Sequence, residues 1–226
     1  MTRHFFPISL LLCMASGVFA AKAVEKVSIQ QDTPGYTINI KYPQNLAGAE
    51  ANQAVKQFID EQQAAFLKTA KGDDFPANIP GKNTLFIDYT IPYQHNKALS
   101  VVFDVSVFNR GAAHPLNVKA VFNFVDGHKV MLADLFIPAS DYLSKLAYYC
   151  RTNLATKDFP DKKWVLMGTK PQKENYKLWS FSEDGLTIIF DTYQIAAYVY
   201  GAQTVNVPKS QFISLLQANI QPAVWG

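Results

Sequence analysis

The chain has 226 residues, of which 49% are hydrophobic and 17% are charged, and its formal net charge is +3 at pH 7. The hydrophobic content excludes a wholly disordered chain, and the length allows one large domain or two small ones. The lysines are scattered, which argues against nucleic acid or an anionic membrane surface as a partner, because both select basic patches.

The first twenty residues predict a secretory signal peptide. Arg3 and His4 precede the apolar run FFPISLLLCMASGVF, which ends in small residues. This run is short for a bilayer span, which needs roughly 20 apolar residues, so we expect cleavage after Ala20 and no transmembrane segment afterwards. A lipoprotein site at Cys13 is disfavoured, because Leu12 stands where a small residue is required. We therefore expect a periplasmic or secreted protein.

The first half of the remaining chain predicts a strand, a helix and three further strands. Residues 36–42 alternate between apolar and polar, whereas residues 49–71 repeat their apolar positions at helical spacing and end at Gly72. Three alternating runs at residues 84–93, 99–108 and 116–125 predict an antiparallel meander, which closes on a turn at Asp126 and Gly127.

The second half predicts a helix from about residue 143 to 154, with Cys150 on its apolar face as an inert thiol. A long polar excursion at residues 158–177 follows, with one helical turn near Trp164. A hairpin around Asp184 and Gly185, a short strand at residues 204–207 and a helix from about Ser210 to Ala218 complete the chain.

This order of elements predicts an α+β fold in which helices pack on one face of antiparallel sheets. We expect a two-part module after the signal peptide at residues 1–20. The first part would comprise residues 21–125 and the second part residues 126–226.

Residues suited to metal or nucleophilic chemistry occur without a recognised spacing. The candidate metal ligands are His114, His128, Asp126 and Asp134, and they match no ligand motif, so we expect neither a metal site nor a cofactor. No nucleophile elbow or reactive-cysteine context is present. A pair of acids suited to glycoside cleavage cannot be selected from the 18 Asp and Glu residues by sequence.

Tyrosines crowd one stretch near the C-terminus and suggest a binding surface. Tyr193, Tyr198 and Tyr200 lie within DTYQIAAYVYG, with Trp164 and Trp179 nearby in sequence. Exposed aromatic rings beside polar groups suit sugars or protein loops, whereas core packing is the alternative for most of them.

A lone histidine stands in the turn FNRGAAHPLN between the second and third strands of the meander. Gly111 supplies backbone freedom, and Pro115 restricts His114 to an extended conformation. We expect the imidazole to hydrogen-bond within this loop, and we keep His114 as a binding candidate beside the tyrosines.

Three short motifs in this order carry a family resemblance: GAAHP at residues 111–115, LADLF at 132–136, and FDTYQIAAYVYG at 190–201 followed by VNVP. From about Val24 to Leu216 the chain resembles the extracytoplasmic domain shared by RsiV-type anti-sigma factors and PdaC-type peptidoglycan deacetylases. Ala112 and Ala197 stand where the family more often has glycine and proline. The motif residues that we expect to shape the module are Gly111, Pro115, Asp134, Phe136 and Gly201.

The resemblance implies a module that faces the cell envelope. In the anti-sigma relatives it binds lysozyme, and in the deacetylase relatives a distinct catalytic domain follows it, so we expect neither sigma-factor control nor deacetylase activity from the module itself. We favour a non-catalytic protein that binds a peptidoglycan-type glycan or a lysozyme-like protein.

An enzyme acting on envelope glycans, either a hydrolase or a deacetylase, is the alternative. Exposed aromatics around residues 193–200 without an acid pair in a cleft would favour binding. A pocket that joins His114 to two carboxylates would favour catalysis. The oligomeric state is not predicted.

Overall fold

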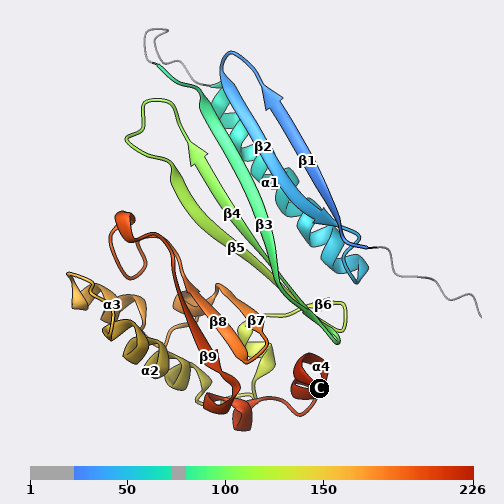
Figure 1. Cartoon of the computed structure of the whole chain (residues 1–226), viewed down its shortest axis with the longest axis vertical. Helices are drawn as coiled ribbons and strands as arrows, with labels where there is room; N and C mark the ends of the chain where they lie inside the picture. The colour runs from blue at the N-terminus through green and yellow to red at the C-terminus, as the bar shows by residue number, and fades with distance from the viewer. Residues whose placement is uncertain (1–22, 73–79) are drawn as a thin grey trace, which may run out of the picture.

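A computed structural model of the chain describes residues 23–72 and 80–226, so the expected signal peptide and Cys13 lie outside the described residues. Two sheets form an α+β fold, as the sequence predicts (Figure 1). Within the described ranges, no helix is both long enough and apolar enough to cross a bilayer.

The first sheet has six strands that lie in chain order. They are β1 (Glu25–Asp32), β2 (Tyr36–Gln44), β3 (Asn83–His95), β4 (Ala98–Phe108), β5 (Leu116–Val125) and β6 (His128–Lys129). β3, β4 and β5 form the predicted antiparallel meander, and Asp126 and Gly127 adopt the positive φ angles of its closing turn, 54° and 81°.

Two features of this sheet differ from the prediction. β1 was not expected, because most of its residues are polar. It lies at the edge of the sheet, where it pairs with β2. β2 and β3 pair in parallel, so the sheet is not wholly antiparallel. The connection between them is α1 (Ala49–Lys71), the predicted helix, and parallel neighbours need such a crossover.

α1 covers one face of the six-stranded sheet (Figure 1). Val55 and Ile59 of the helix pack in one core with inward residues of the central strands, such as Ile40, Ile87 and Phe103. These side chains alternate with polar ones that point to the opposite, outer face, since successive strand residues alternate in direction. The outer face is therefore the polar side of the sheet.

The second sheet has three antiparallel strands, β7 (Trp179–Ser182), β8 (Gly185–Phe190) and β9 (Gln203–Pro208). α2 (Tyr142–Ala155) and α3 (Lys162–Gly168) accompany it, and α2 contacts β9. Cys150 is buried in this second core, as predicted. The boundary expected at Val125 stays a prediction: β6 still belongs to the first sheet, and Val125 packs in the second core.

The helix predicted from Ser210 to Ala218 is wrong. Two 3₁₀ turns, η4 (Lys209–Gln211) and η5 (Ile213–Leu215), occupy this stretch, and the last helix, α4, spans Ile220–Trp225. The backbone N–H of Ile137 donates to the carbonyl of Leu215 at 2.8 Å, and that of Gln217 donates to the carbonyl of Leu135 at 2.9 Å. These backbone groups pair with the η1 region (Leu132–Leu135), so they are not available for a continuous helix.

The second sheet packs against part of the outer face. Asn123 donates to the carbonyl of Trp179 at 2.7 Å, the Ser100 hydroxyl donates to the Asn123 amide oxygen at 2.6 Å, and the N–H of Phe181 donates to Ser100 at 2.9 Å. Next along the strands, Val102 and Val121 pack against Leu178 and Ile189. Beyond these contacts the sheets separate and leave β4 and β5 uncovered, and the cleft described below lies there.

We predict that Asn123→Ala lowers the free energy of unfolding by about 2 to 3 kcal/mol, because it leaves buried partners on both sheets without hydrogen bonds. Urea denaturation followed by tryptophan fluorescence measures this loss. Asn153→Ala, an exposed position on α2, is the matched control and should change stability by less than about 0.5 kcal/mol. Equal effects of the two substitutions would contradict a bridging role for Asn123.

Candidate functional site

The family-motif residues shape turns and anchor them. Gly111 and Gly201 have φ angles of 87° and 61°, which glycine adopts readily. The Asp134 carboxylate accepts the N–H of Met131 at 2.8 Å and caps η1. Phe136 is buried and stacks on Tyr142, with ring centroids 4.3 Å apart. These contacts are structural.

His114 lies in an aromatic cluster that the fold assembles from distant segments. Its ring stacks on Tyr198, with centroids 4.0 Å apart, and its Nδ1 donates to the carbonyl of Pro115 at 3.0 Å. The Tyr193 hydroxyl lies 3.3 Å from Nε2 and donates to it in this tautomer. Tyr198 in turn donates its hydroxyl to the Pro115 carbonyl at 2.9 Å. We call His114, Tyr193 and Tyr198 the aromatic rim.

The loop after β8 is held in a fixed shape that presents Tyr193. The Gln194 side chain accepts the N–H of Asp191 at 3.1 Å and donates to the carbonyls of Gly168 and Asn175. Tyr193 has a φ of 68°, a region that non-glycine residues rarely adopt. The Trp164 indole N–H, from α3, donates to the Tyr193 carbonyl at 2.8 Å. The predicted helical turn near Trp164 therefore supports this loop.

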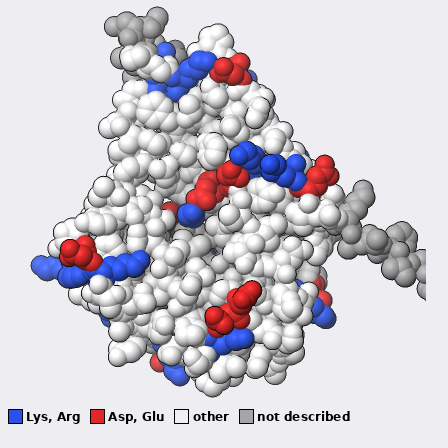
Figure 2. All heavy atoms as spheres, viewed as in Figure 1, with Lys and Arg blue, Asp and Glu red and all other residues white. Residues whose placement is uncertain are grey.

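A cleft of about 760 Å³ lies between this loop and the uncovered part of the outer face. Residues of β3 to β5 form its floor, and residues between Asp191 and Ala202 form its wall. Three aromatic side chains line it, namely Phe86, Tyr198 and Tyr200, together with the polar residues Asp104, Ser106, Asn117, Lys119, Asp191 and Thr192. Figure 2 shows a hollow in this face and a short row of charged side chains leading to it across a mostly uncharged surface.

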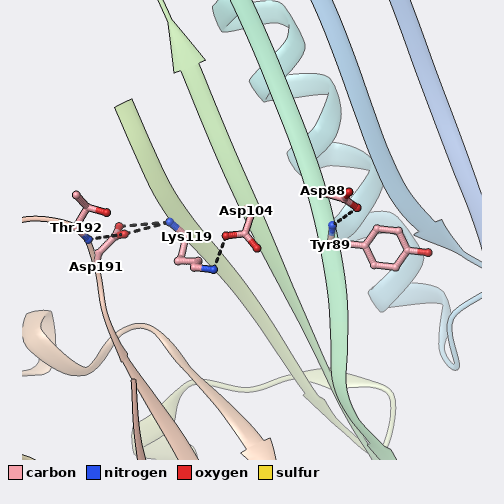
Figure 3. A network of polar contacts seen from close by, with 6 residues as sticks. All are labelled: Asp88, Tyr89, Asp104, Lys119, Asp191 and Thr192. Atoms are coloured by element: carbon pink, nitrogen blue, oxygen red, sulfur yellow. Dashed lines mark hydrogen bonds and ion pairs between the residues drawn. The ribbon is translucent and has the colours of Figure 1, made fainter. Parts of the chain in front are cut away.

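The charged row runs from β2 across β3, β4 and β5 to the residue that follows β8, and Figure 3 shows it from Asp88 to Asp191. Asp88 on β3 pairs with Lys41 on β2 at 3.1 Å, and Asp104 on β4 pairs with Lys119, its cross-strand partner on β5. Asp191, at the end of β8, accepts the backbone N–H of Lys119 at 3.2 Å and that of Thr192 at 2.9 Å. The cleft therefore contains two carboxylates and one ammonium group.

The two ends of this row differ in their electrostatics. Burial raises the pKa of Asp191 above the ordinary value, against the opposing effects of the Thr192 and Lys119 N–H groups and of the lysines nearby. Burial also acts on Asp88, but the Tyr89 N–H and the Lys41 ammonium outweigh it and hold the pKa of Asp88 below the ordinary value. Asp191 is thus a carboxylate whose negative charge is poorly solvated.

The sequence-predicted binding residues are brought together only in part. Tyr198 and Tyr200 line the cleft, while His114 and Tyr193 stand beside it in the aromatic rim. Sequence reasoning did not select Asp104, Lys119 or Asp191. The outward register of β4 and β5 and the position of Asp191 inside the FDTY motif were the available signals.

The candidate metal ligands lie apart. His114 precedes β5 and His128 follows it, where it contacts Glu50 at 3.2 Å. Within residues 23–72 and 80–226, no group of three or more His, Cys, Asp or Glu side chains is arranged to hold a metal ion. Burial raises the pKa of the Cys150 thiol to about 12, which keeps it protonated and unreactive.

Both halves of the cleft fall in stretches that match family models. Residues 29–117, which include Asp104 and Asn117, match the model described as deacetylase PdaC, and residues 133–210, which include Asp191 and Tyr198, match the model of the protein of unknown function DUF3298. The two matches together support a PdaC/DUF3298-type domain. Its resemblance to RsiV-type anti-sigma factors stays a prediction.

A curated relative shares sequence with this domain over most of its length. The chain is 29% identical over 198 residues to peptidoglycan-N-acetylmuramic acid deacetylase PdaC of Bacillus subtilis strain 168. The match covers 86% of this chain and 42% of that protein. The chain therefore spans less than half the length of this relative.

Two crystal structures share the fold of the PdaC/DUF3298-type domain. A DUF3298 family protein from Pseudomonas aeruginosa PAO1 has a TM-score of 0.62 at 13% identity, covering 88% of this chain and 97% of that chain. A member from Bacteroides fragilis NCTC 9343 has a TM-score of 0.57 at 16% identity, covering 88% and 96%. At these identities the likeness shows the fold alone.

We predict that Asp191 titrates above the ordinary aspartate pKa of about 3.9 and Asp88 below it. Carbon-13 NMR of the side-chain carboxyl groups measures both midpoints. Because the folded protein binds the Asp191 proton more tightly than the unfolded chain does, this group adds stability as pH falls through its folded pKa. Midpoints in the reverse order would contradict this account of the row.

We predict that His114→Gln lowers the free energy of unfolding by about 1 kcal/mol, because glutamine has no ring to stack on Tyr198. Thermal and urea denaturation measure the loss, and His128→Gln, another exposed histidine, serves as the control. If His114→Gln left stability unchanged and abolished ligand binding, the structural role of His114 would be wrong.

Proposed function

We propose that this protein is an exported, non-catalytic module of the cell envelope that binds a peptidoglycan-type glycan in the cleft. The observation that carries the proposal is the composition of the cleft, in which exposed aromatic rings and hydrogen-bonding side chains line one open concave surface. A periplasmic or secreted location is part of the same proposal.

The aromatic lining suits a sugar ring. Phe86 projects from the β3 part of the floor with 40% of its surface exposed, and Tyr200 is 38% exposed on the wall. Flat apolar faces of this kind bury area on a pyranose at little entropic cost. A ligand lying over β4 and β5 would contact both rings.

The polar lining suits hydroxyl and amide groups. Ser106 and Asn117 are cross-strand partners on the floor, and Asp104 and Lys119 form the next outward pair along the strands. Such side chains offer donors and acceptors at fixed spacings, which is how a saccharide is oriented. The relative from Bacillus subtilis is named for its action on peptidoglycan N-acetylmuramic acid, which supports a glycan of this class as the ligand.

A catalytic role on envelope glycans is the second candidate, because two carboxylates line the cleft and burial raises the pKa of one of them, Asp191. Binding is favoured for two reasons. Asp104 is paired with Lys119 and Asp191 caps backbone N–H groups, so both carboxylates already hold the structure together. His114 does not line the cleft, and its ring nitrogens are engaged within the aromatic rim.

We predict that residues 21–226 co-sediment with purified peptidoglycan sacculi, and that Phe86→Ala weakens this binding by about tenfold through loss of the stacking face. Tyr148→Ala removes a tyrosine that is 74% exposed on α2, outside the cleft, and should leave binding unchanged. Equal effects of the two variants would contradict binding in the cleft.

Two parallel measurements separate the alternatives. Binding to lysozyme without binding to sacculi would indicate that the ligand is a protein and not a glycan. Release of muropeptides or acetate in the absence of stoichiometric binding would show that the protein is an enzyme.

A further inference from the structure

The carboxylates of the charged row outnumber its lysines. Asp88 and Asp104 are direct cross-strand partners, and like charges in this position destabilise a sheet. Lys41 pairs with Asp88, and Lys119 pairs with Asp104. Both lysines of the row are therefore engaged, and a third carboxylate, Asp191, faces the same cleft.

Asp191 accepts hydrogen bonds from backbone groups. Within residues 23–72 and 80–226, the N–H groups of Lys119 and Thr192 are the only donors to its oxygens. Among the residues that the structure describes, no lysine, arginine or histidine side chain forms an ion pair with it, and Lys177 and Lys119 act on it through space. A cation delivered by a ligand would compensate this half-buried charge.

The aromatic lining of the cleft favours a cation as well. Phe86, Tyr198 and Tyr200 line the same space, and the face of an aromatic ring attracts an ammonium group. Lys41 illustrates the effect, because its Nζ lies 5.9 Å from the centroid of the Phe86 ring. A sugar could stack on one wall while its amino group reaches the carboxylates.

We infer that the cleft selects amino sugars that carry a free ammonium group, the form left when the N-acetyl group of a glycan is removed. The inference rests on the proposed function, since it names the class of glycan bound at that site. A neutral N-acetyl amide would leave Asp191 uncompensated, whereas the ammonium group of a de-N-acetylated sugar would form a charge-assisted hydrogen bond in a partly buried site.

The test compares two soluble probes of equal length, glucosamine oligomers and N-acetylglucosamine oligomers, by isothermal titration calorimetry with residues 21–226. At a pH at which the amine is protonated, the glucosamine oligomer should bind at least about tenfold more tightly, as expected for a hydrogen bond between charged groups. Asp191→Asn should bring the two affinities together, and Asp60→Asn should keep the preference, because Asp60 lies on α1, across the sheet.

Each outcome decides a different statement. Equal or tighter binding of the N-acetylated oligomer overturns the preference and leaves the proposed glycan-binding function standing. Failure of both oligomers and of sacculi to bind overturns both. If Asp191→Asn does not fold, the salt dependence of binding by the native protein serves as the test instead. The preference for the glucosamine oligomer should decrease as salt screens the ion pair. A preference that does not depend on salt overturns the inference.

Discussion

The buried hydrogen bonds of Ser100 and Asn123 fix how the two sheets meet, and the cleft depends on this junction. Removing such groups from water is costly unless every partner is present, so the junction tolerates one relative placement of β4, β5 and β7. The successive outward residues of β4 therefore have different surroundings. Ser100 bonds to the second sheet, Val102 packs against it, and Asp104 and Ser106 face the cleft.

Asp191 links the geometry of the cleft to its electrostatics. Its carboxylate caps the N–H of Lys119 on the outer edge of β5, and in the part of the chain that the structure describes no further strand pairs with that part of β5. An exposed strand edge invites pairing with other chains, and an acidic group placed against it is one way to prevent this. The same placement removes the carboxylate from water and raises its pKa. The Asp191 carboxylate therefore both caps the edge of β5 and places a negative charge in the cleft.

His114, in the aromatic rim, also has two roles. His114 shapes its turn through Pro115, as the sequence indicates, and its stacking on Tyr198 also ties the β4–β5 turn of the first sheet to the loop that walls the cleft. The fold recurs in DUF3298 structures that share only 13% and 16% of their residues with this chain. Backbone architecture therefore tolerates wide sequence change.

The sequence by itself determined the local elements. Period-2 runs gave β2 to β5 and helical spacing gave α1 and α2, because these patterns reflect burial on one side of an element. The Asp126-Gly127 pair gave the closing turn of the meander, and the hairpin expected around Asp184 and Gly185 is present, with Glu183 and Asp184 as its turn and Gly185 as the first residue of β8. It could not find the polar strand β1, whose assignment depends on pairing with β2, or the break after β9, where backbone groups pair with the η1 region. Tyr198 and Tyr200 were selected from local crowding. Asp104, Lys119 and Asp191 required the tertiary structure. Cross-strand register places Asp104 beside Lys119, and only the meeting of the two sheets brings Asp191, 72 positions after Lys119, into the same cleft.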